Sequence, residues 1–397
     1  MVSELHSTGQ EQNMILNMGP QHPSTHGVLR LVLELDGEIV VRCDPVIGYL
    51  HTGFEKTYEQ KNYLQGVTLT DRMDYLSPLS NNLCYSLAVE KLLDIEVPPR
   101  AEVARVLLAE LTRIGSHLVW LGTGAIELGA MSVFLYCFRE REMLMDIFES
   151  CSGQRMMTSY IRPGGLAADL PDGFEEMVEE FLRTFPSRQD EYEDLILENR
   201  IFKDRTVDIG KLTVDQCIAY GLTGPNLRAS GFESDLRISN SYCGYETYDF
   251  EVPVTAKGDV YDRFLVRLAE MRESVKICWQ ALERLPDGPY TTADRKVAFP
   301  PREELGTSME AVIHHFKLAT EGYRVPAGEY YQCIESPRGE LGMYIVADGS
   351  SRPYRLRVRA PSFANLQILG PASEGALVAD LVAIIGSLDP VMGEVDR

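Results

Sequence analysis

Closely spaced cysteines are missing from this chain of 397 residues. Its eight cysteines are scattered, and no two of them form a CxxC pair, of which iron–sulfur and zinc sites usually have at least one. The sequence therefore predicts no metal site held by this chain alone, and we expect most of these thiols to be small core residues. The start, Met1-Val2-Ser3-Glu4, is acidic and polar, unlike a secretory signal, so a disulfide framework is not expected either.

Long apolar runs and an excess of positive charge are missing as well. The longest charge-free runs, residues 76–89 and 360–373, are well short of a membrane-spanning helix. The net charge is −21, so nucleic acid and anionic lipid are poor partners, and we expect a soluble chain that meets basic protein surfaces. There is no GxxxxGK(S/T) motif or dinucleotide fingerprint, so direct nucleotide binding is not expected. A basic stripe on one expected strand, Arg355, Arg357 and Arg359, either pairs within the chain or meets a partner protein.

The spacing of apolar residues predicts an α+β fold that is mainly helical. Alternation predicts strands near both ends of the chain, with Asp36-Gly37 as a hairpin turn, and the spacing becomes helical from about Glu55. We expect a flexible N-terminus (1–13), a β region with a His-bearing loop (14–54), a helical bundle (55–325) and a C-terminal β region with a tail (326–397). The expected helices cover residues 71–93, 100–121, 131–151, 174–185, 189–199, 259–285 and 301–321.

The most informative segment is Gly19-Pro20-Gln21-His22-Pro23-Ser24-Thr25-His26-Gly27, between two expected strands. Two prolines stiffen it, and the flanking glycines permit turns that other residues resist. Histidine is the side chain most easily drawn into proton transfer near neutral pH. By chemistry alone, the segment is either a polar connection with solvent-facing histidines or a loop that presents donors and acceptors to a ligand.

Two further groups stand out for their chemistry. Tyr75, in Asp71-Arg72-Met73-Asp74-Tyr75, has a hydroxyl that stays protonated at neutral pH and can donate to a carbonyl. The alternative is a helix cap followed by an ordinary core tyrosine. Glu127 is an isolated carboxylate in an apolar stretch between two expected helices, and if buried it needs a cationic or hydrogen-bonding partner.

Taken together, these segments resemble the D subunit of proton-pumping NADH:quinone oxidoreductase, respiratory complex I. The resemblance runs from about Met14 to Arg397 and implies the fold of the related hydrogenase large subunit, a helical bundle with small antiparallel sheets from both ends of the chain. Several stretches of sequence carry it: 19–27, 47–56, 71–75, 89–93, 160–165, 227–231, 271–276, 361–363 and 389–397.

The relation to nickel–iron hydrogenases can be tested on the residues that bind their metal. Hydrogenases use the cysteines of the motifs RxCGxC and DPCxxC. Here Asp74 and Ser77 occupy the cysteine positions of the first motif, and Val391 and Glu394 occupy those of the second. Because such soft metals require thiolates, the resemblance implies no bound metal and no hydrogenase activity.

In place of the metal, the resemblance implies a quinone site. His26 and Tyr75 would donate hydrogen bonds to the two carbonyls of the quinone head group, where positioned donors stabilise the charge added on reduction. Glu127 would pair with His26 and stabilise its imidazolium, and Val391 would line the chamber.

Arg72 and Met157 would lie near the terminal iron–sulfur cluster of a partner protein, where the fixed charge of Arg72 raises the cluster's electron affinity. Many members have a histidine where this chain has Met157, and most have aspartate in place of Glu127. Since methionine does not titrate, we expect a lower, nearly pH-independent midpoint potential, suited to a low-potential quinone such as menaquinone.

The resemblance also implies partners and a location. The chain would bind no redox cofactor by itself: quinone is its substrate, the iron–sulfur cluster belongs to the B subunit, and NAD(H) is bound elsewhere in the complex. Its other partners would be the C and I subunits and the membrane-embedded H subunit, with the chain peripheral on the cytoplasmic side of the inner membrane. It would act only within the multisubunit translocase. Two alternatives stay open: the same role with ferredoxin or deazaflavin as electron donor, and a scaffold protein with an inactive site.

Overall fold

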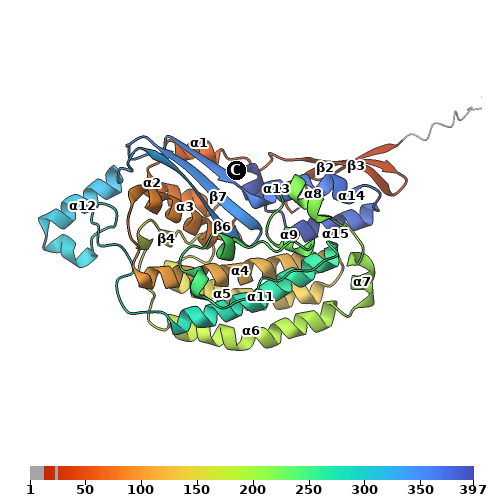
Figure 1. Cartoon of the computed structure of the whole chain (residues 1–397), viewed down its shortest axis with the longest axis horizontal. Coiled ribbons are helices and arrows are strands. Elements are labelled where there is room, and N and C mark those ends of the chain that lie inside the picture. The colour runs from red at the N-terminus through yellow and green to blue at the C-terminus, as the bar shows by residue number, and fades with distance from the viewer. Residues whose placement is uncertain (1–12, 23–25) are drawn as a thin grey trace, which may run out of the picture.

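In the computed structural model, which describes residues 13–22 and 26–397, long helices form a layer against small antiparallel sheets (Figure 1). Helix predominates over strand, so the predicted α+β, mainly helical fold class is confirmed. Residues 1–12 of the expected flexible N-terminus lie outside the described residues. The same holds for Pro23, Ser24 and Thr25 of the histidine-bearing loop.

The N-terminal sheet anchors the histidine-bearing loop. Its strands β1 (Met14–Met18), β2 (Arg30–Asp36) and β3 (Ile39–Val46) pair antiparallel in that order, as predicted. Leu31, Leu33 and Leu35 of β2 are buried, and β3 packs on α14 (Leu369–Ser373). Residues 19–29 join β1 to β2, so both ends of the loop are held by one sheet.

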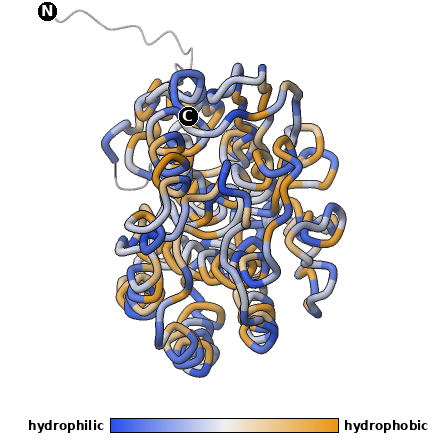
Figure 2. Tube along the Cα trace, turned by 90° about the vertical axis from the view of Figure 1, so that its left-hand side faces the viewer, coloured by the Kyte–Doolittle hydropathy of each residue, from blue (hydrophilic) through white to orange (hydrophobic). Residues whose placement is uncertain are grey.

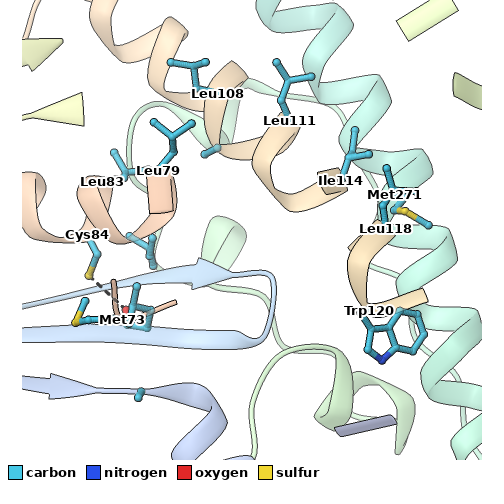
Figure 3. Packing of buried hydrophobic residues seen from close by; sticks show 14 of the residues in the cluster. Met73, Leu79, Leu83, Cys84, Leu108, Leu111, Ile114, Leu118, Trp120 and Met271 are labelled. Carbon is cyan, nitrogen blue, oxygen red and sulfur yellow. Dashed lines mark hydrogen bonds between the residues drawn. The ribbon is translucent and has the colours of Figure 1, made fainter. Parts of the chain in front are cut away.

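Helix α4 (Pro99–Glu127) is the centre of the bundle and packs against both α5 (Met131–Ser152) and α11 (Val260–Glu283). Its leucines and isoleucine point into the core, where Met271 of α11 meets them (Figure 3). Pro99 occupies the first turn of the helix, where its missing N–H costs nothing, as the sequence predicts.

The C-terminal sheet packs on α3 (Pro78–Leu93) and turns one arginine inward. Its strands β6 (Gly328–Ser336), β7 (Gly339–Ala347) and β8 (Arg355–Arg359) are antiparallel, and the β6–β7 turn carries the fully buried Arg338. Within the basic stripe, Arg355 pairs with Glu59 at 2.9 Å and Arg357 with Glu55 at 3.1 Å, which favours the internal alternative for these two.

Shorter elements complete the chain, and no helix of the described part is long and apolar enough to cross a membrane. Figure 2 shows hydrophilic and hydrophobic residues interspersed along the helices. The remaining elements are α1 (Phe54–Tyr58), α2 (Tyr63–Thr70), β4 (Ile161–Arg162), β5 (Gly165–Leu166), α6 (Phe174–Ile196), α7 (Arg200–Thr206), α8 (Val214–Ala219), α9 (Pro225–Ala229), α10 (Leu236–Ser239), η2 (Tyr245–Thr247), η3 (Arg302–Gly306), α12 (Met309–Thr320), α13 (Pro361–Gln367), α15 (Val378–Leu388) and α16 (Met392–Asp396).

Two helix predictions near the site are wrong in their bounds. The helix expected over 71–93 begins only at Pro78, because proline disfavours a helical conformation in the residue before it; residues 71–77 form turns instead. The helix expected to end at Leu121 continues to Glu127, so this glutamate is the last residue of α4 and not part of a connection.

Two other helices differ because packing outweighs local preference. The pair expected at 174–185 and 189–199 is the single helix α6, in which Pro186 is internal and the buried face continues through Phe185, Gln189 and Tyr192. The helix expected over 301–321 is divided into η3 and α12, since Ser308 caps a new helix at Met309.

Candidate functional site

Arg338 ties together the two segments that match the metal-binding motifs of hydrogenases. Its Nη1 donates to Asp74 Oδ2 at 2.8 Å, and its Nη2 donates to Asp389 Oδ1 at 3.2 Å. Nη1 also donates to Ser116 Oγ of α4 at 2.8 Å. The guanidinium and both carboxylates are buried, so these bonds act with little screening by water. We call Arg338, Asp74, Asp389 and Glu394 the arginine cluster.

The positions of the missing cysteines do lie close to one another. Gly393 packs on the turn that carries Asp74: a Cβ at residue 393 would lie 2.4 Å from the carbonyl oxygen of Met73. Val391 and Glu394 are both bonded to Ser362, since the Val391 N–H donates to Ser362 Oγ and the Ser362 N–H donates to Glu394 Oε1. Hydrogen bonds and an ion pair therefore join the segments that a metal joins in hydrogenases.

Burial keeps the negative charge of the arginine cluster low. It raises the pKa of Glu394 to about 7, with the nearby Asp74 carboxylate as the next contribution in the same direction. Burial also raises the pKa of Asp74, although Arg338 opposes the shift. One guanidinium faces three carboxyl groups, and a proton on Glu394 relieves their repulsion near neutral pH.

Tyr75 lies at the edge of the arginine cluster and remains a hydrogen-bond donor. Its side chain is half-buried, and its ring faces Gly393, where a Cβ would lie 3.2 Å from Tyr75 Cδ1. Burial raises the pKa of the phenol, and the Asp74 carboxylate adds to the shift. The hydroxyl therefore carries its proton at any physiological pH.

His26 enters the same region from the N-terminal sheet. Its φ of 48° lies in the left-handed region that few residues other than glycine adopt, and Gly27 follows with φ 100°. Burial lowers the pKa of the imidazole, while Asp389 raises it and Arg338 lowers it. Since these two charges also act on Tyr75, both candidate donors face the arginine cluster.

Glu127 and His26 are brought together by the fold. Glu127 Oε1 lies 3.8 Å from His26 Nε2, a nitrogen that has no hydrogen-bond partner among the described residues. Burial raises the pKa of Glu127 to about 8. Both groups are thus neutral near pH 7: the glutamate holds a proton and the imidazole does not hold an extra one.

Arg72 and Met157 lie on segments that Asp71 joins. The Asp71 Oδ2 atom accepts from the backbone N–H of Ser159 at 3.0 Å, which fixes the chain beside Met157 next to Arg72. Arg72 is exposed and Met157 is half-buried. Val391, by contrast, is only 2% exposed in this chain.

Sequence analysis missed the central cation of the site. Arg338 stands in an ordinary hairpin turn, Pro337-Arg338-Gly339, and nothing in its spacing points to Asp74, 264 positions away. Asp389 belongs to the DPCxxC-like segment, but its pairing with Arg338 is not evident from the sequence. The one available signal is an arginine between two strands whose neighbours are apolar.

Fold and site together define a hydrogenase-like protein in which an ion-paired polar cluster replaces the metal ligands. The family model for the 49-kDa subunit of respiratory-chain NADH dehydrogenase matches residues 127–397. The chain therefore belongs to the family of this 49-kDa subunit, whose bacterial relatives carry the letter D in their names, and it is part of a multisubunit oxidoreductase.

The similarity to such relatives extends over nearly the whole chain. The chain is 63% identical over 392 residues to the D 2 subunit of the NADH-quinone oxidoreductase of Chloroflexus aurantiacus, covering 98% of this chain and 95% of the relative. It is 64% identical to the D 2 subunit of a Roseiflexus species, covering 98% and 94%. The D subunit of Geotalea uraniireducens is 56% identical over 384 residues, with 97% and 98% covered.

Proposed function

We propose that this chain forms one wall of the chamber in which quinone is reduced by electrons from an iron–sulfur cluster of a partner protein. The observation that carries the proposal is the convergence of two proton-bearing groups, His26 and Tyr75, on a buried arginine cluster where a related enzyme family holds its metal. A neutral imidazole and a neutral phenol suit an uncharged quinone, whose carbonyl oxygens accept hydrogen bonds.

The chemistry of the step follows from these protonation states. Two electrons and two protons convert quinone to quinol, and negative charge develops on both carbonyl oxygens as the electrons arrive. Tyr75 donates its phenolic proton to one oxygen and His26 donates its N–H proton to the other. Protonated Glu127 then returns a proton to His26, because the carboxyl lies next to Nε2 and has its pKa near 8.

Arg72 and Met157 are assigned to the side facing the partner's cluster. A fixed positive charge near a cluster favours its reduced form and thus raises its midpoint potential. Met157 contributes no titratable group, so we expect this potential to change little with pH. A lower potential than in relatives with histidine there suits menaquinone.

Partners and location follow from the same proposal. The B subunit carries the terminal cluster, the C, I and H subunits complete the surroundings, and NADH delivers electrons to flavin and clusters elsewhere in the complex. The chain is then peripheral to the cytoplasmic side of the inner membrane. Purification of the intact complex with identification of its chains tests this, and ferredoxin- or deazaflavin-dependent partners in place of NADH-binding ones would change the donor.

Replacement of Tyr75 with phenylalanine tests the catalytic role in the assembled complex. We expect quinone reduction to fall about 100-fold while electron transfer from NADH to an artificial acceptor is unchanged, since a positioned proton donor contributes roughly 10²–10⁴-fold. The exposed Tyr354→Phe is the matched control. Full quinone reductase activity in Tyr75→Phe would favour a scaffold protein with an inactive site.

A further inference from the structure

The Glu127 carboxyl occupies space that exists only because residue 386 is glycine. A Cβ built on Gly386 would lie 2.3 Å from Glu127 Oε2 and 3.5 Å from Glu127 Cδ. Outside its own helix and its chain neighbours, Gly386 would bring its Cβ within 4 Å of no other atom of the described residues. Any larger residue at 386 would therefore displace this one carboxyl group and nothing else in that part of the chain.

The backbone at Gly386 is held where it is. Its carbonyl accepts a hydrogen bond of 2.8 Å from Trp120 Nε1, and Trp120 belongs to α4, the helix that ends at Glu127. The Trp120 side chain is itself fixed in the core, with the Phe264 ring 4.4 Å away and the Arg267 guanidinium over it at 4.5 Å (Figure 3 shows Trp120 beside α11). Helices α4 and α15 are thus locked together two turns before the glutamate.

The carboxyl lies between this glycine and the imidazole. Its Oε2 faces Gly386 and its Oε1 lies 3.8 Å from His26 Nε2. Because glutamate is one methylene longer than aspartate, a carboxyl carried by residue 127 needs more depth on the α15 side. The missing side chain at 386 supplies that depth.

We propose that Gly386 is a positioning residue for proton transfer, and that its lack of a side chain sets where the Glu127 carboxyl stands against His26. The inference rests on the proposed function, since Glu127 matters only if it serves His26. It further implies that the length of residue 127 and the size of residue 386 are coupled.

A purely structural role for Gly386 predicts something different. The residue lies within α15, in a helical backbone that accepts alanine, and alanine is favoured over glycine in helices by about 1 kcal/mol. The atom in the way of a methyl group is the end of a flexible side chain. Gly386→Ala should therefore fold and assemble as well as the wild type or better, while the carboxyl moves by roughly 1 Å to reach ordinary van der Waals contact.

The test is a double-mutant cycle in the intact complex with Gly386→Ala, Glu127→Asp and the pair. We expect Gly386→Ala to lower kcat for quinone reduction by ~10-fold or more, as misplacement by 1 Å can, and to alter the pH profile, with assembly and thermal stability unchanged. In the pair, the shorter carboxyl no longer meets the methyl group, so activity should be at least that of Glu127→Asp alone. Gly306→Ala, whose Cβ would meet nothing within 4 Å, is the matched control.

Two results overturn the inference: wild-type kcat and pH profile in Gly386→Ala, or losses in the pair that equal the product of the single losses. Glu127→Gln separates this failure from that of the proposed function. If Glu127→Gln impairs quinone reduction while Gly386→Ala does not, only the positioning role of Gly386 is wrong. If Glu127→Gln is also without effect, the role proposed for Glu127 itself is wrong.

Discussion

The Arg338 guanidinium donates to the Asp74 carboxylate at 2.8 Å, across 264 positions of the sequence. This contact joins the β6–β7 turn to the turn that carries Tyr75, and Asp389 extends it to the segment of Val391. A buried ion pair thus holds in place the two segments that a metal holds in the related hydrogenases. The charges around this pair determine how the protein should respond to substitution and to pH.

Removal of the cation should destabilise the protein strongly. Arg338→Met leaves the Asp74 and Asp389 carboxylates buried without their partner, and breaking a buried pair in this way costs about 3–5 kcal/mol. We expect little of the mutant chain in the purified complex and a lowered thermal transition for what is assembled. Arg355→Met, which breaks a half-exposed pair worth about 0–1 kcal/mol, is the control. Equal stability of the two variants would contradict the account.

Glu394 should make the stability of the protein fall as pH rises. Burial raises its pKa from 4.5 to about 7, so between these values the folded state binds a proton that the unfolded state has lost. Stability contributed by this proton is present below pH 4.5 and is lost up to about pH 7. In Glu394→Gln, thermal stability should vary less with pH over this window. The exposed Glu374→Gln should behave like the wild type, and an unchanged pH dependence in Glu394→Gln would count against the raised pKa.

Quinone reduction should weaken as the pH rises through the pKa of Glu127. The glutamate can return a proton to His26 only while protonated, and burial raises its pKa to about 8. We expect kcat to decline above about pH 8 in the wild type, and Glu127→Gln to lose this decline together with most of the activity. A wild-type profile that is flat through pH 8 would show that Glu127 is not the proton source.

A histidine at residue 157 should make the cluster potential depend on pH. Methionine has no proton to gain, so redox titrations of the wild-type complex, followed by electron paramagnetic resonance, should give a nearly constant midpoint potential. Met157→His should raise the potential at low pH, where the imidazole is charged, and introduce a slope. The exposed Met131→His serves as control. A full slope in the wild type would refute the assignment of Met157.

The fold was predictable where a local pattern determines an element. Alternating leucines predicted β2, and Pro99 predicted the start of α4. The prediction failed where distant contacts decide: the apolar face of α6 continues past Pro186, and Glu127 is helical because α4 packs to its last turn.

The site was predictable only in part, for the same reason. Resemblance to known motifs named His26, Tyr75 and Glu127. It did not reveal Arg338 or Gly386, because the importance of each rests on a partner from a distant part of the sequence, Asp74 for the arginine and Glu127 for the glycine. A cation in a hairpin turn and a glycine in a helix carry no local signal of this kind.

The measurement that tests the central claim most directly is photolabelling of the intact complex with a light-activated quinone analogue, followed by mapping of the labelled peptides. If this chain forms a wall of the chamber, label attaches to the segments around His26, Tyr75 and Val391, and an excess of unlabelled quinone displaces it. Label confined to other proteins of the complex, or label on these segments that quinone does not displace, would contradict the account.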